Sequence, residues 1–179
     1  MGRKDIFGGL PEILKQSDHD LNGRLIEVRQ LGVLFPNMAS HLMIQFGGEI
    51  LKIVDEVSAN LSSLYSGRQA VHVGEEIFFR KSIIVGETTQ MVCRVVHTTE
   101  KIIVVHTQIF GGEFDLSRFT LRYEGFSLCG IIGENGKLDA VPQLSVTNDV
   151  KNSSIQTLSE QVVNHQKQTL KNLDAWRGL

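Results

Sequence analysis

One long amphipathic helix, predicted over Gly47 to Tyr65, constrains the fold more than any other feature of this sequence. Its apolar side chains recur at intervals of three and four residues, which places them on one stripe of the helix surface. The stripe consists of Ile50, Ile53, Val54, Val57, Leu61 and Leu64, and the opposite face carries Glu49, Lys52, Glu56, Asn60 and Ser63. A helix of this kind needs an apolar partner layer, and Ser66-Gly67 supplies the signal that ends it.

Asp55 belongs to neither face of this helix. At roughly 100° per residue it falls on a flank, beside Leu51, Ala59 and Ser62. An acid at this border can contact a cleft without being fully buried. For an isolated helical aspartate, a solvated surface role is the ordinary alternative.

The chain after this helix consists mostly of predicted strands. They cover Val71 to Phe79, Thr89 to His97, Ile102 to Phe110 and a segment through Phe119, Leu121 and Tyr123, whose alternation with Arg118, Thr120 and Arg122 predicts a half-buried strand. Adjacent Glu75 and Glu76 should point to opposite faces of their strand, so they cannot share a substrate. A further strand-like segment begins at Arg24, and a polar helix is expected over Ser154 to Trp176. Because strands and helices do not alternate, the order predicts an α+β fold in which an antiparallel sheet wraps around one long central helix, with an additional C-terminal helix.

Composition excludes several classes of function. A length of 179 residues suits one domain, and 18 Lys and Arg against 20 Asp and Glu leave no broad basic surface for nucleic acid. No apolar run reaches the roughly 18 residues of a membrane span, and Met1 to Gln16 has no signal-peptide pattern, so we expect a cytoplasmic protein without membrane contact. Cys93 and Cys129 lie in apolar strand-like runs and are expected to be buried free thiols. The histidines lack metal-ligand spacing, so no metal site is predicted.

Several short motifs occur in an order and spacing that match the signatures of one family. The signature PNDxNxxGxxFGGxxLxxxDE resembles Phe35-Pro36-Asn37, Phe46-Gly47-Gly48 and Val54-Asp55-Glu56, and Ser66-Gly67-Arg68 follows. The signature FLKPVKVGD resembles Phe79 to Glu87, and DENGKxxxVP resembles Gly133 to Lys137 with Val141-Pro142. Together, over about Arg24 to Leu144, they resemble the hotdog-fold acyl-CoA thioesterases. We expect the chain to divide into a leader segment of unknown role over residues 1–22, a hotdog domain over 23–145, and a polar segment with the C-terminal helix over 146–179.

The resemblance also implies an activity and an assembly. Members hydrolyse acyl-CoA to free CoA and a carboxylic acid, with CoA as part of the substrate and no separate cofactor. They form dimers with active sites between subunits, so we expect a homodimer that assembles further into a hexamer.

The resemblance assigns roles to particular residues. Asp55 falls on the general base or nucleophile, and Gly47 and Gly48 fall on the helix start whose N–H groups receive the oxyanion. Ser40 stands where the family has a catalytic asparagine, and Met43 replaces a motif glycine. The candidates for binding the CoA phosphates are Arg68, Arg80, Lys81 and Lys101, although Glu100 replaces the arginine of the family's GRTS loop.

A catalytically silent hotdog domain is the alternative from another functional class. Such a domain would bind acyl-CoA as a sensor or an assembly module without turning it over. Ser40 in place of asparagine favours this alternative, whereas Asp55 and the Gly47-Gly48 helix start favour the hydrolase. A DNA-binding regulator would need a helix-turn-helix before the sheet, and a dehydratase would need a histidine-containing motif that is not evident.

Overall fold

The computed structural model describes residues 27–113, 118–144 and 150–177. The expected leader over residues 1–22 therefore lies outside the described residues, as does the predicted strand start at Arg24. Within the described ranges, no helix has the length and apolarity needed to cross a membrane.

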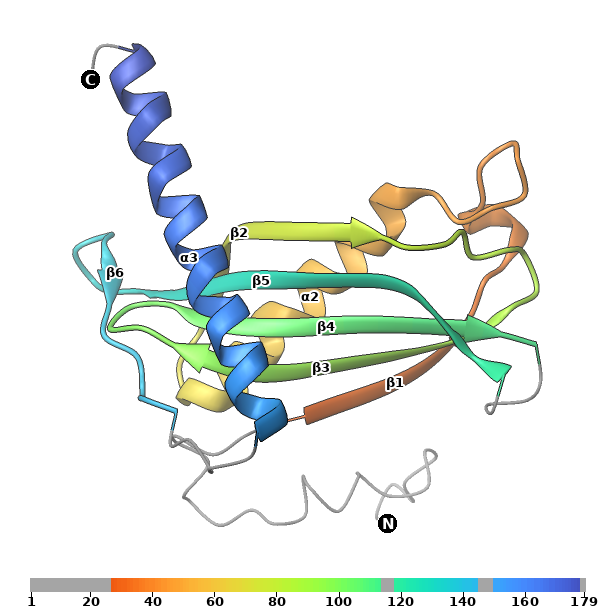
Figure 1. Ribbon diagram of the computed structural model, residues 1–179, viewed down its shortest axis with the longest axis horizontal. Helices are drawn as coiled ribbons and strands as arrows, with labels where there is room; N and C mark the ends of the chain where they lie inside the picture. Colours follow the sequence, from red (N-terminus) through yellow and green to blue (C-terminus); the bar gives the residue numbers. More distant parts are fainter. Residues whose placement is uncertain (1–26, 114–117, 145–149, 178–179) are drawn as a thin grey trace, which may run out of the picture.

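One antiparallel sheet and two helices form the fold (Figure 1). The strand order is β1-β3-β4-β5-β2, and β6 pairs with β5. The strands are β1 (Glu27–Val33), β2 (Ala70–Phe79), β3 (Thr88–Thr98), β4 (Ile103–Gly112), β5 (Thr120–Ile132) and β6 (Leu138–Asp139). Helix α2 (Gly47–Ser66) lies on one face of the sheet and α3 (Val150–Arg177) crosses the other, while a 3₁₀ turn, η1 (Pro36–Met38), precedes α2. The predicted α+β class is confirmed.

The main core lies between α2 and the sheet. Val54 and Tyr65 of α2 are fully buried against strand residues such as Val95 and Val105. The predicted stripe was wrong in part, because Leu64 is 47% exposed whereas Ser58 and Ser62 are fully buried. Serines lie where the helix faces the sheet most closely, and the Ser58 hydroxyl donates to Ser127 Oγ of β5 at 3.1 Å. Small hydroxyl side chains that bond across the layer can replace apolar ones at such positions.

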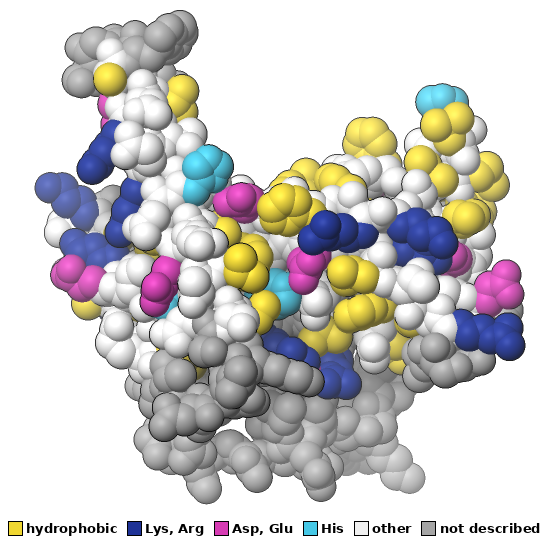
Figure 2. Space-filling model, in the orientation of Figure 1, with side chains coloured by type: hydrophobic (Ala, Val, Ile, Leu, Met, Phe, Trp, Pro, Cys, Tyr) yellow, Lys and Arg dark blue, Asp and Glu magenta, His cyan; other side chains and the backbone are white. Residues whose placement is uncertain are grey.

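A smaller apolar cluster lies under α3 on the opposite face. Val162 and Val163 pack against Val104, Phe126 and Leu128. Figure 2 shows α3 as a ridge on this face, with hydrophobic side chains exposed on the sheet beside it. The exposed side chains of this face include those of Leu31, Val33 and Phe78.

Arg122 departs from the simple alternation that the sequence predicted for β5. The β4–β5 register shifts between Ile109 and Phe110, which pair with Tyr123 and Leu121, so Arg122 is the extra residue of a β-bulge. Its side chain is 4% exposed and forms a 2.5 Å ion pair with Glu87. It also donates to the carbonyl oxygens of Ser82 and Gly111, at 3.1 and 3.3 Å. The bulge turns this arginine inward, where it ties the β2–β3 connection to the sheet.

Several local predictions are confirmed. Gly67 ends α2 in the left-handed region, with φ 66°. Gly136 closes the β5–β6 hairpin at φ 72°, and its N–H donates to the Gly133 carbonyl at 3.0 Å. Cys93 and Cys129 are free and buried. Each of these features depends on neighbours in sequence or on an apolar run.

Candidate functional site

The segment before α2 is held in a tight turn against the β2–β3 connection. The Met43 N–H donates to the Ser40 carbonyl at 3.0 Å, and the Ser40 hydroxyl accepts from the Leu42 N–H at 3.3 Å. Met43 has φ 57°, a left-handed conformation that explains why a glycine suits this position in the signature. Bonds from Gln45 N–H to the Ile83 carbonyl and from the Val85 N–H to the Met43 carbonyl fix the segment beside residues 83–85.

Helix α2 begins at Gly47 without a side-chain cap. Phe46 is the N-cap residue and makes no side-chain capping bond. Among the described residues, the N–H groups of Gly47 and Gly48 have no hydrogen-bond acceptor, which is usual for the first turn of a helix. A Cβ on Gly48 would lie 2.9 Å from the Phe46 ring. The helix start thus offers two N–H donors and the positive end of the helix dipole to an anion.

Asp55 lies on the flank of α2, as its position in the sequence predicted. Its side chain is 55% exposed, and Oδ1 contacts Nδ1 of His72 on β2. No other described residue hydrogen-bonds to this carboxylate. The His72 side chain is 15% exposed, and its Nε2 lies 2.7 Å from the Gly74 carbonyl oxygen. One carboxylate oxygen is thereby held in place, while the group as a whole remains open to solvent.

A second carboxyl group lies on the same face of β2. Tyr123 Oη donates to Glu75 Oε1 at 2.9 Å, and burial raises the pKa values of both Glu75 and Tyr123 above their ordinary values. Glu76 points to the other face, where its carboxylate lies 3.4 Å from His165 of α3. The prediction that these two glutamates face opposite sides is confirmed.

His72 was missed as a site residue by sequence reasoning. The sequence places it in a strand with no nearby ligand partner, and its contact with Asp55 spans two elements. Only the pairing of α2 with β2 brings the two side chains together. No local spacing rule carries this information.

The helix start and Asp55 are well separated within one chain. Asp55 comes seven residues after Gly48 along α2, a rise of about 10.5 Å at 1.5 Å per residue. Ser40 hydrogen-bonds to neither of them, since its backbone and hydroxyl bonds stay within residues 40–44. The structure therefore does not bring the four predicted catalytic residues Ser40, Gly47, Gly48 and Asp55 to one point.

The four predicted phosphate-binding cations separate into two pairs at opposite ends of the sheet. Arg80 and Lys81 follow the end of β2, on the side where α2 begins. Arg80 forms a 3.0 Å ion pair with Glu124, and its guanidinium lies 5.4 Å from the centre of the Phe78 ring. Lys101 lies in the β3–β4 turn and Arg68 just before β2, both at the other end. One chain cannot present all four to a single phosphate group.

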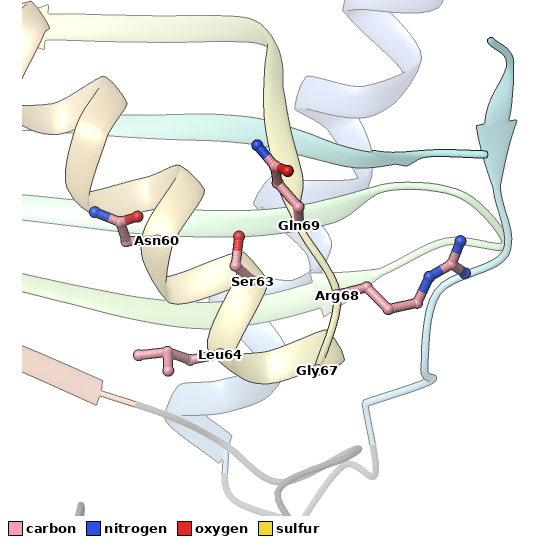
Figure 3. A pocket seen from close by; sticks show the side chains of 6 residues that line it. All are labelled: Asn60, Ser63, Leu64, Gly67, Arg68 and Gln69. Carbon is pink, nitrogen blue, oxygen red and sulfur yellow. The ribbon is translucent and has the colours of Figure 1, made fainter. Parts of the chain in front are cut away.

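A hollow of about 600 Å³ opens at the C-terminal end of α2 (Figure 3). Its lining residues are Asn60, Ser63, Leu64, Gly67, Arg68 and Gln69. The Arg68 side chain extends away from Asn60, and its guanidinium pairs with Asp139 of β6 at 2.8 Å. Neither Asp55 nor the start of α2 borders this hollow.

The segment that carries Asp55 resembles a known family. Residues 44–114 match the family described as the thioesterase superfamily. The matched segment extends from the turn before α2 to the end of β4, and so includes Gly47, Gly48, Asp55 and His72. No curated protein matches the chain.

Solved structures share the fold of this chain. An acyl-CoA hydrolase from Staphylococcus aureus, in complex with butyryl coenzyme A, has a TM-score of 0.74 at 20% identity, over 84% of this chain and 93% of its own. A hexameric acyl-CoA thioesterase has a TM-score of 0.72 at 22% identity, over 80% and 92%. An acyl-CoA hydrolase from Bacillus cereus has a TM-score of 0.73 at 14% identity, over 84% and 91%. The resemblance to hotdog proteins expected from the motifs is confirmed.

Proposed function

We propose that this protein hydrolyses acyl-CoA thioesters to free CoA and a carboxylic acid, with Asp55 as the general base or nucleophile. The observation that carries the proposal is the Asp55 carboxylate, which is solvent-accessible and held by one oxygen, in a segment that matches the thioesterase superfamily. Gly47 and Gly48 at the helix start supply the N–H donors for the oxyanion.

The chemistry follows from these groups. In the general-base form, Asp55 Oδ2 accepts a proton from water as its oxygen bonds to the thioester carbon. The carbonyl oxygen gains negative charge and is stabilised by N–H donors at the start of α2. The C–S bond then breaks, and the CoA thiolate receives the proton from Asp55.

The distance along α2 supports an active site between two copies of the chain. A thioester carbonyl at the Gly48 N–H lies too far from Asp55 of the same helix for both to act on it. Strand β2, which carries His72, is an edge strand of the sheet. Among the described strands it pairs only with β5. An edge strand with free N–H and C=O groups can extend the sheet into a second copy. We therefore propose a homodimer, assembled further into a hexamer, as in the structures named hexameric.

The residues altered in the Staphylococcus aureus hydrolase support the choice of site. Solved variants of that protein replace an asparagine, an aspartate and a threonine by alanine, at intervals of 15 and 17 residues. Ser40, Asp55 and His72 have the same two intervals. This agreement favours Asp55 as the acid, with Ser40 in the position of the asparagine. The Ser40 hydroxyl accepts one bond from its own turn, so its proton is still available to donate.

We further propose that Arg80 and Lys81, close to the start of α2, bind CoA phosphates, with Arg68 and Lys101 contributing from a second copy. The expected cytoplasmic location remains a prediction.

Release of free thiol from short, medium and long acyl-CoAs tests the proposed function. We expect turnover by the wild type and a loss of at least about a hundredfold in Asp55→Asn, since general-base catalysis contributes about 10² to 10⁴. Glu56→Gln is the matched control, because Glu56 is the exposed next residue of the same helix. Binding of acyl-CoA without any thiol release would favour the silent binding module instead. Unchanged turnover in Asp55→Asn would refute the role of Asp55.

A further inference from the structure

We propose that His72 is the positioning residue for Asp55: a doubly protonated imidazole that holds Oδ1 and leaves Oδ2 free to act on water. The proposal rests on the proposed function of Asp55. It adds a hydrogen-bonded state of the histidine and a restricted orientation of the carboxylate to that site.

Both ring nitrogens of His72 face atoms that can only accept a hydrogen bond from it. Nδ1 contacts a carboxylate oxygen of Asp55, and Nε2 lies 2.7 Å from the Gly74 carbonyl oxygen. A neutral imidazole has one N–H and one lone pair, so it can satisfy only one of these acceptors. The ring is 15% exposed, which leaves little room for water to compensate. The doubly protonated ring satisfies both contacts.

A β-bulge in β2 creates this arrangement. His72 pairs with Cys129 and Gly74 pairs with Leu128, so Val73 has no partner in the register. The extra residue of the bulge brings the Gly74 carbonyl within hydrogen-bond distance of the His72 imidazole. It also returns Glu75 to the face that His72 occupies, opposite Ser127. Bulges of this kind often re-aim side chains next to active sites.

The same geometry excludes His72 itself as the general base. A base at Nε2 would need a free lone pair, but Nε2 faces a carbonyl oxygen and must carry a proton to bond with it. In the usual acid–histidine pair, the carboxylate orients the histidine that reacts. Here the histidine orients the carboxylate, because Asp55 is the exposed partner and His72 is the enclosed one.

The groups near the ring come from three elements. Asp55 faces it from α2 and Glu75 lies near it on β2. Cys129 and Tyr123 are the titratable groups of β5 that interact with Glu75. Burial raises the pKa of Cys129 to about 11 and that of Tyr123 above its ordinary value, so both stay neutral through the physiological range.

Steady-state kinetics of His72→Gln test this role. A glutamine amide can donate to Asp55 at any pH but cannot hold both contacts or carry charge. We expect kcat to fall between about tenfold and a hundredfold, as for loss of a hydrogen bond to a charged group, with a much smaller change in KM. The control is His165→Gln, which alters an exposed histidine on the other face and should keep the wild-type kcat.

Nitrogen NMR of the His72 ring gives a readout that does not depend on turnover. In the full-length wild type at neutral pH we expect both ring nitrogens to carry protons, because each faces a hydrogen-bond acceptor. A bare Nε2 at neutral pH in the wild type would overturn the proposal. An unchanged kcat in His72→Gln, with Asp55→Asn inactive, would refute the role of His72 alone. Thiol release that survives Asp55→Asn would refute the proposed function itself.

Discussion

Replacement of Arg122 by methionine should destabilise this protein far more than replacement of any exposed arginine. Arg122 is 4% exposed, and its guanidinium bonds to the Glu87 carboxylate and to two backbone carbonyl oxygens. Methionine retains much of the apolar stem but leaves Glu87, whose side chain is only 13% exposed, without its cation. Removing one partner of a buried ion pair costs about 3–5 kcal/mol. We therefore expect the free energy of unfolding to fall by about this amount.

Urea unfolding at one fixed protein concentration measures this change and keeps any contribution from subunit association comparable. The matched control is Arg80→Met, because Arg80 also pairs with a glutamate but is 52% exposed on its side chain. An exposed pair contributes about 0–1 kcal/mol, so the control should change little. A loss of less than 1 kcal/mol in Arg122→Met, with an unchanged denaturant slope, would refute the reasoning from burial.

Three further predictions follow from burial, charge and backbone conformation. Burial raises the pKa of Cys93 and Cys129 to about 11, so neither thiol should react with a disulfide reagent at pH 8 until the protein is unfolded, which absorbance measures. Burial alone would raise the pKa of Glu124, but hydrogen bonds from Arg80 and neighbouring side chains lower it below its ordinary value of 4.5. Its contribution to stability is therefore present above pH 4.5 and is lost as pH falls further, so the stability difference between wild type and Glu124→Gln should shrink in acid unfolding curves. Gly67→Ala should cost about 1 kcal/mol in urea unfolding because φ is 66° there, and a change near zero would contradict this.

The parts of the fold that depend on local sequence were predictable. The apolar period of α2 fixes its length within a residue, and Gly67 and Asn135-Gly136 identify its end and the β5–β6 turn. These signals involve residues that are neighbours in sequence. The alternation of apolar residues likewise located four of the strands.

The parts that depend on register were not predictable in the same way. Arg122 was expected on the polar side of a strand, and one extra residue in β5 places it inside. His72 reaches Asp55 because α2 packs against β2 and a second bulge follows His72. A bulge depends on the pairing of two strands, so alternation within one strand does not reveal it.

The candidate site shows the same limit. The flank position of Asp55 followed from helical geometry alone, whereas a shared location for Arg68, Arg80, Lys81 and Lys101 did not follow from their spacing. The sheet separates them into two pairs, because β2 lies between Arg68 and Arg80. Motif order along a chain does not state which motifs meet within one subunit and which meet across an interface.

Complementation between two inactive variants tests most directly whether Asp55 and the α2 start of another copy form one thioester-hydrolysing site. Asp55→Asn removes the base, and Gly48→Pro removes an N–H in the first helical turn, where proline is tolerated. Each variant alone should release almost no thiol from acyl-CoA. In equal co-expression, half of randomly formed twofold dimers are mixed and each mixed dimer has one intact site, so activity should recover to about a quarter of the wild type. Activity no greater than the average of the two variants would contradict a site shared between copies.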